Sequence, residues 1–244
     1  MQRAAFIGFA LAVLALAGAA GAGLGYRLEV WPLRAAFTIL RGSAYGGISA
    51  AVLSLICAVW ILRQGPYRGL MPALAGLILG AAVAAVPYSH LRTARTVPPI
   101  HDISTDLNQP PPFVEALAHR AGAPNAAAYG GESIARQQRE AYPDIRPLFL
   151  QAPPAAAFAR ALAAARDLGW EIVAAAPSEG RIEATDRTFW FGFEDDVVVR
   201  IRAAGGGSLV DVRSVSRVGR SDVGTNARRI RRFLQRVAEG AGDR

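Results

Sequence analysis

Three uncharged apolar stretches before Tyr88 constrain this chain more than any other feature of its sequence. They run from Ala4 to Leu24, from Ala44 to Leu62 and from Gly69 to Val86. Each is close to the length needed to cross the hydrocarbon core of a bilayer. A chain in lipid must also satisfy its own backbone hydrogen bonds, which favours helices. We therefore predict three transmembrane helices and an integral membrane protein.

Details of these stretches leave several alternatives open. Arg3 followed by an apolar run is also typical of a cleaved signal peptide, which would leave two spans. The pairs Gly21/Gly25 and Gly76/Gly80 have the spacing that lets membrane helices approach closely, although general glycine richness explains them equally well. The segment 33–40 is predicted to be a short interfacial helix or a plain loop.

Charge divides the chain near Ser89. Residues 1–89 contain six Arg and one acid, whereas residues 90–244 contain 21 Arg and 18 acids. Because the chain has no Lys, its Arg content is a compositional bias, and we predict no nucleic-acid partner. The only cysteine, Cys57, lies in a predicted span, which excludes an intrachain disulfide. We expect a transmembrane region (1–89), a Pro-rich extended segment with short helices (90–146) and a folded domain (147–240).

The pattern after Pro147 predicts an α+β domain with the order β-α-β-β-β-β-α. Short turns between consecutive strands imply an antiparallel sheet with helices packed on one face. In the strand around residues 181–184, Ile182 and Ala184 alternate with Arg181 and Glu183, which predicts a half-buried strand. The last helix begins near Asp222 and carries an apolar face opposite an Arg-rich one.

Several motifs occur in order along this part of the chain, within residues 98–106, 141–148, 183–193, 195–200 and 211–222. Together they resemble the bacterial and plastid family catalogued as domain of unknown function fourteen-ninety-nine, in its three-span membrane form. The resemblance covers about residues 97–237 and implies no catalytic residue. Some relatives are exported lipoproteins, which implies an extracytoplasmic domain. Relatives often carry a Cys pair in the first motif, and this chain does not.

His101, Asp102 and Asp144 are candidates for general acid–base chemistry, since a His near carboxylates is suited to proton transfer. The alternative is that Asp102 and Asp106 bond local backbone in turns. We predict no metal site, because the three His residues form no paired ligand motif. No nucleotide fingerprint outside the membrane spans suggests a cofactor, so none is expected.

Two further groups are candidate contact sites. Aromatic residues gather just before the acidic run 194–196, at Phe189, Trp190, Phe191 and Phe193. They predict either contact with a partner or lipid, or core packing with a bend at Gly192.

The second group precedes and begins the last helix, where an anion could bind. Its members are Arg213, Arg217, Arg220, Ser221 and Asn226. The alternative is that Asp222 caps the helix while the arginines pair with acids of the domain.

These observations favour a non-catalytic binding or envelope-assembly module, anchored in a bacterial inner membrane, that contacts an anionic ligand, lipid headgroups or a membrane-protein partner. A hydrolase-like enzyme using His101 with Asp102 or Asp144 is one alternative. A lipid-handling domain with an apolar pocket is another. The distribution of Arg about the spans is nearly balanced, and the oligomeric state stays open.

Overall fold

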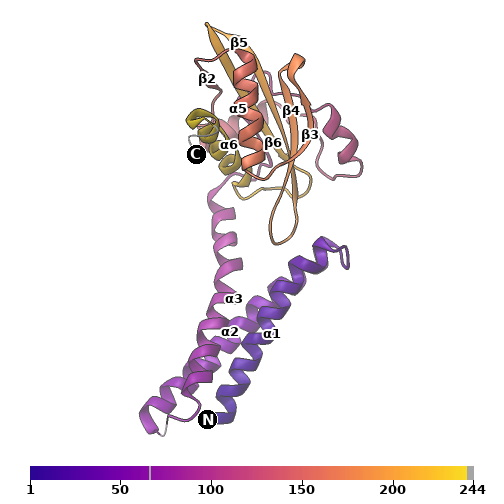
Figure 1. The fold of residues 1–244 in the computed structure, drawn as a ribbon. Coiled ribbons are helices and arrows are strands. Elements are labelled where there is room, and N and C mark those ends of the chain that lie inside the picture. The colour runs from indigo at the N-terminus through magenta and orange to yellow at the C-terminus, as the bar shows by residue number, and fades with distance from the viewer. Residues whose placement is uncertain (66, 241–244) are drawn as a thin grey trace. The chain divides into compact units, whose positions relative to one another are not determined.

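The computed structural model describes residues 1–65 and 67–240. Their contacts divide into two units, and each is described by itself. The first unit comprises residues 1–93 together with the short segment Phe189–Gly192, and the second comprises residues 94–188 and 193 onward. We refer to them as the helical unit and the sheet domain (Figure 1).

The helical unit contains α1 (Gln2–Arg27), α2 (Leu33–Gln64) and all but the last three residues of α3 (Leu70–Thr96). All three are long and apolar enough to cross a membrane. The separate interfacial helix expected at 33–40 is not formed, because this stretch is the first part of a continuous α2. Extending an existing helix adds a hydrogen bond for each residue ordered, whereas a second helix needs a new nucleus. Helix α3 likewise continues through Pro87.

Small residues let the three helices approach closely. A Cβ added to Gly8 would lie 2.5 Å from Ser54 Oγ, and one added to Gly47 would lie 2.8 Å from the carbonyl oxygen of Gly80. A Cβ at Gly76 would meet Ser54 and Phe9, and one at Gly80 would meet the Gly47 carbonyl oxygen, so of the two alternatives for this pair the close approach of helices is observed. Gly21 has no neighbouring atom within 4 Å of such a Cβ, so close approach does not require glycine there.

The sheet domain is built on one antiparallel sheet. Its strands are β1 (Asp102–Ser104), β2 (Leu148–Leu150), β3 (Glu171–Ala176), β4 (Arg181–Arg187), β5 (Glu194–Ala204) and β6 (Gly207–Ser216). The spatial order is β1-β6-β5-β4-β3, and β2 also pairs with β6. The helices are η1 (Glu115–Arg120), α4 (Glu132–Ala141), α5 (Pro154–Asp167), η2 (Pro177–Glu179) and α6 (Thr225–Glu239). The predicted α+β class is confirmed, and from β2 onward the strands and α-helices follow the predicted order.

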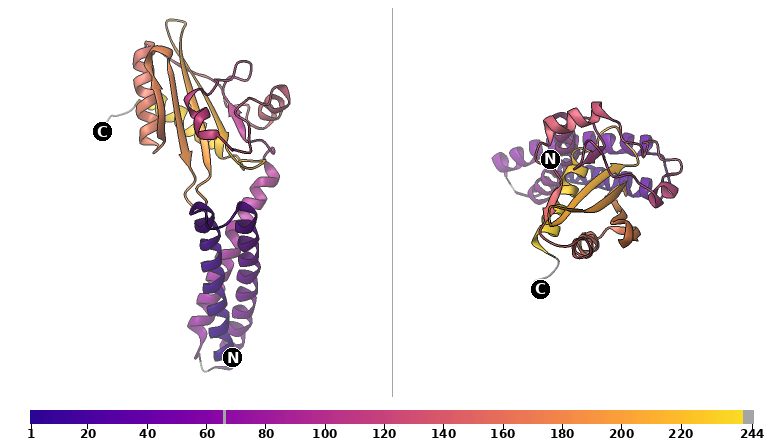
Figure 2. Two further views of the ribbon diagram at one scale, coloured as in Figure 1. Left: turned by 90° about the vertical axis from the view of Figure 1, so that its right-hand side faces the viewer. Right: turned by 90° about the horizontal axis from the view of Figure 1, so that it is seen from above.

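Helices α5 and α6 cover one face of this sheet (Figures 1 and 2). We call it the helix face, and its strand residues are Ile182, Ala184, Val197, Val199, Ile201, Val210 and Val212. Phe158 on α5 and Phe233 on α6 pack in the same apolar cluster. Burial of these side chains is the main source of stability on this side of the sheet.

The opposite face is lined by charged residues. We call it the ionic face; its strand residues include Arg181, Glu183, Asp196, Arg200, Asp211 and Arg213, and Arg217 directly follows β6. The segment 105–131, which includes η1, bonds to many of these side chains and is called the covering segment. Because of it, Arg181 and Glu183 are buried, so the half-buried prediction for β4 was wrong.

Candidate functional site

The ionic face follows from the two-residue period of the strands. On β5 the valines 197 and 199 point to the helix face, which directs Asp196 and Arg200 to the other side. On β6 the same alternation directs Asp211 and Arg213 away from Val210 and Val212. The antiparallel register places Arg200 opposite Asp211. Arg200 Nη2 lies 2.9 Å from Asp211 Oδ2.

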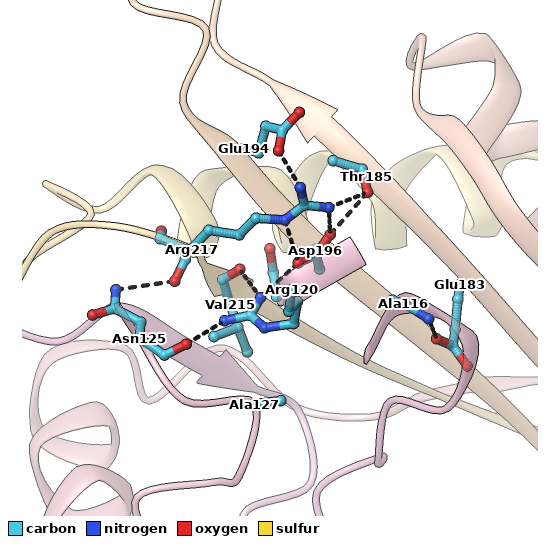
Figure 3. Close-up of polar contacts among 12 residues, drawn as sticks. Ala116, Arg120, Asn125, Ala127, Glu183, Thr185, Glu194, Asp196, Val215 and Arg217 are labelled. Atoms are coloured by element: carbon cyan, nitrogen blue, oxygen red, sulfur yellow. Dashed lines mark hydrogen bonds and ion pairs between the residues drawn. The ribbon is translucent and has the colours of Figure 1, made fainter. Parts of the chain in front are cut away.

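Asp196 is the centre of this network (Figure 3). Its carboxylate accepts hydrogen bonds from Arg217 at 2.8 and 2.9 Å, from Arg120 at 2.6 Å and from Thr185 at 2.8 Å. Burial by itself raises the pKa of Asp196, but these donors outweigh it and hold the pKa below its usual value. The carboxylate is therefore an ionised structural anchor.

Glu183 fixes the start of η1. Its carboxylate accepts backbone N–H groups of Val114 at 3.0 Å and Ala116 at 2.8 Å (the latter drawn in Figure 3). It also accepts a hydrogen bond from Arg181 Nη1. A carboxylate at the beginning of a helical turn satisfies donors that have no partner within the turn. Glu183, which is fully buried, thus attaches the covering segment to β4.

Arg213 attaches the covering segment at two other points. Its guanidinium donates to the carbonyl of Pro111 at 3.3 Å and to that of Ala127 at 2.7 Å. It also forms a paired contact with Asp102, at 2.9 and 2.8 Å. Burial raises the pKa of Asp102 above its usual value, although Arg213 acts in the opposite direction. This pair is consequently costly to bury and depends on both partners.

The candidate acid–base residues have separate partners. Asp144 forms an exposed ion pair with Arg231 at 2.6 Å, and the hydrogen bond from Arg231 lowers the pKa of Asp144. His101 Nδ1 lies 3.4 Å from the carbonyl oxygen of Arg220. Asp102 is occupied by Arg213. Among the described residues, no hydrogen bond or ion pair joins His101 to Asp102 or Asp144.

The residues predicted to bind an anion are distributed over several contacts. Arg213 and Arg217 are bonded to carboxylates of the ionic face. Asn226 Nδ2 donates to the carbonyl of His101 and to Ser216 Oγ, both at 3.0 Å. Ser221 Oγ accepts from the backbone of Val223 at 3.2 Å. An anion would have to displace these partners, except at the exposed Arg220.

Asp222 performs the capping role expected for it. Its carboxylate accepts the backbone N–H groups of Gly224 and Asn226, both at 2.8 Å. Burial raises the pKa of this carboxyl group, against the effect of both hydrogen bonds. The first donors of α6 are therefore already bonded within the protein.

The aromatic run forms the loop between β4 and β5. Phe193 N donates to Thr188 Oγ1 at 2.8 Å, and Gly192 adopts φ +68°, a left-handed conformation that suits glycine. Phe189 is 92% exposed. Phe191 is buried and stacks on Phe37 within the helical unit, with ring centroids 5.6 Å apart. Lipid or partner contact by this loop stays a prediction.

A shallow depression of about 120 Å³ lies where α5 ends and α6 begins. Its lining is apolar at Leu168 and Trp170 and polar at Thr225, at the Asp186 carboxylate and at three guanidinium groups, those of Arg228, Arg229 and Arg232. The sequence pattern places these arginines only on one Arg-rich face of the last helix. Their spacing along α6 predicts a shared face, but not that the end of α5 would complete a concave site.

Candidate metal ligands are dispersed over the described part of the chain, in which no three His, Cys, Asp or Glu side chains are grouped closely enough to hold an ion. The carboxylates of the ionic face bind guanidinium or backbone N–H groups instead. This arrangement supports cohesion of the sheet and its covering segment rather than coordination chemistry.

The fold is that of a membrane protein with three apolar helices, which are long enough to cross a bilayer, followed by an antiparallel α+β domain. The family described as protein of unknown function (DUF1499) matches residues 102–237, and the chain belongs to this family. The matched region includes every strand of the sheet and most of α6. No curated protein and no solved structure is significantly similar to the chain.

Proposed function

We propose that this protein is a membrane-anchored, non-catalytic binding module whose sheet domain contacts anionic groups, in particular lipid headgroups. The observation that carries this proposal is the unequal pairing of charges. Among described residues from 94 onward, the acids without an ion pair to another described residue are Glu140, Asp167, Asp222 and Glu239.

More arginines than acids are left over. Those without an ion pair to a described residue are Arg95, Arg136, Arg146, Arg160, Arg166, Arg220, Arg228, Arg232 and Arg236. All of them are exposed except Arg236, which is half-buried. Most acidic side chains of the domain are paired with arginines. The exposed positive charge is therefore larger than the net charge of the domain suggests. Each basic residue near an anionic membrane contributes about 1 kcal/mol of attraction.

The contacts of the sheet domain give less support to the two alternatives. A hydrolase would need His101 and a carboxylate to act on one substrate, yet Asp102 and Asp144 are bonded to different arginines. A lipid-handling domain would need apolar space between sheet and helices. That space holds packed side chains, among them Phe158, Ile230 and Phe233.

A lipid-retention experiment tests the proposal on the full chain. The protein is purified in neutral detergent, exposed to equal amounts of phosphatidylglycerol and phosphatidylcholine, and the retained lipid is measured. We expect phosphatidylglycerol to be preferred and the preference to weaken as salt rises, because exposed charges are screened. Equal retention of the two lipids would contradict the proposal.

A matched pair of charge variants locates the effect. One replaces exposed or half-buried arginines of the sheet domain by Gln, at Arg160, Arg166, Arg228, Arg232 and Arg236. The other removes the same number of charges from the helical unit, at Arg3, Arg34, Arg41, Arg63 and Arg68. The proposal requires a larger loss of preference in the first variant. A loss confined to the second would assign lipid binding to the helices.

The placement of the domain is also part of the proposal. We infer a bacterial inner-membrane location with the domain extracytoplasmic, supported by the exported relatives that the sequence motifs resemble. Reporter fusions at Arg244 that are active on only one side of the membrane test this. Activity of the cytoplasmic reporter alone would place the domain on the other side.

A further inference from the structure

The depression at the α5–α6 junction combines concave shape with guanidinium groups that differ in their partners. Arg229 is almost fully buried and donates to Asp186 at 2.7 Å and to Asp195 at 2.6 Å. Two carboxylates thus more than compensate its charge. Arg229 therefore forms part of the wall of the site and is not free to neutralise a ligand.

Arg228 and Arg232 form no ion pair with a described residue. They are exposed and lie four positions apart on α6, which places them on the same side of the helix. Arg228 is oriented by hydrogen bonds to the carbonyl of Val223 at 3.1 Å and to Thr225 Oγ1 at 3.0 Å. Arg232 makes no hydrogen bond to any described residue. Two guanidinium groups at the depression consequently keep donors for an external anion.

We propose that this depression binds a phosphate group, either inorganic phosphate or the monoester headgroup of a lipid. The inference rests on the proposed function and names its ligand class. A phosphate group presents several acceptor oxygens, so both guanidinium groups can bind it at the same time. Arg228 and Arg232 supply the positive charge for the anion, because the Asp186 carboxylate in the lining is already bonded to Arg229.

The depression is small and open to solvent, with a volume of about 120 Å³. A phosphate group bound there would leave any attached nucleoside or acyl chain in solvent or lipid. Leu168 and Trp170 form the apolar side of the depression, so the anion binds toward α6.

Phosphate binding to the full chain in neutral detergent provides the test. Inorganic phosphate is titrated by isothermal calorimetry into the wild type and into Arg228→Gln, Arg232→Gln and Arg139→Gln. Arg139 is exposed on α4, is paired with Glu132 and does not line the depression, so its variant is matched in charge. We expect about a tenfold loss of affinity for each of the first two, because each removes a charged hydrogen-bond donor to the anion, and little change for the third.

Competition distinguishes the two sources of phosphate. Micelles containing phosphatidic acid compete with inorganic phosphate if the ligand is a lipid headgroup, whereas phosphatidylcholine micelles do not. Inorganic phosphate binding without such competition assigns the site to a soluble phosphate.

Absence of phosphate binding to the wild type overturns the inference, and so does an equal loss in Arg139→Gln. Either result can coexist with a preference for phosphatidylglycerol, which would leave the broader proposed function standing.

Discussion

Both faces of the sheet are covered, one mainly through apolar contacts and the other mainly through ion pairs and hydrogen bonds. On the helix face, Val197 and Val199 meet apolar side chains of α5 and α6. On the ionic face, their neighbours Asp196 and Arg200 meet side chains of the covering segment and the adjacent strands. Apolar burial is non-directional, whereas a buried charge is stable only if its partner is correctly placed.

The two faces should therefore respond differently to a substitution that removes a side chain. An apolar side chain that is shortened leaves a cavity which its neighbours partly fill. A charged side chain that is removed leaves its buried partner unpaired, and relaxation cannot supply the missing charge. Adjacent residues 182 and 183 on β4 point to the two faces and permit a direct comparison.

The largest effect is expected for Glu183→Ala. The substitution removes the acceptor for Val114 and Ala116 and leaves Arg181 without one of its carboxylates. We expect a loss of about 3–5 kcal/mol, as for other buried pairs that lose one partner. Thermal unfolding of the full chain in detergent measures it, and limited proteolysis should show earlier cleavage in the covering segment.

Glu179→Ala is the matched control, because Glu179 bonds the same Arg181 with a side chain that is 60% exposed. Its cost should be below about 1 kcal/mol. Similar costs for the two glutamate variants would show that the ionic face does not depend on buried pairing.

A somewhat smaller effect is expected for Ile182→Ala on the helix face. Ile182 is 1% exposed and lies in the apolar cluster. The loss should be about 2–5 kcal/mol from transfer and cavity terms. Unfolding measured at low and high salt should give the same difference from the wild type, and the covering segment should stay resistant to protease.

Leu117→Ala, at a side chain that is 48% exposed, should change stability by less than about 0.5 kcal/mol. A salt-dependent cost for Ile182→Ala, or early cleavage of the covering segment, would mean that the two faces are not independent.

The smallest effect is expected for the change of stability with pH that Asp196 contributes, as distinct from the cost of removing its carboxylate. Since its pKa in the folded protein lies below the usual 3.8, its contribution to stability is fully present above that value. The contribution is lost as pH falls through the lowered pKa. Asp196→Asn should therefore be less stable than the wild type at neutral pH, and the difference should narrow below about pH 4.

Unfolding midpoints of both proteins at neutral and acidic pH measure this change. Arg187→Gln, at a side chain that is 55% exposed, is a control that should show little cost at any of these pH values. If the stability difference between Asp196→Asn and the wild type widens on acidification, the prediction is wrong.

Much of the fold could be predicted because its signals are local. The apolar runs predicted α1, α2 and α3, and alternation with turn residues predicted the strands from β2 onward. The capping role of Asp222 was also available from its position before α6. The continuation of α2 through residues 33–40 was missed, because a short amphipathic pattern does not show whether the next helix joins it.

The ionic face could not be predicted from the same signals. Arg181 and Glu183 alternate with apolar residues, as do side chains directed to solvent, and only the covering segment makes them buried. Arg120 reaches Asp196 across 76 positions of sequence. Pairing over such a separation depends on strand register and on the path of the covering segment.

By itself, the sequence determined three apolar helices, an antiparallel α+β domain and an excess of arginine, because these depend on residue type and short-range period. Only the tertiary structure decided which charges are buried and which remain available. Asp102 and Asp196 became partners of Arg213 and Arg217, whereas Arg228 and Arg232 kept free donors beside a depression. The physical reason is that the partner of a charge is set by distance in space, which residue type and local period do not specify.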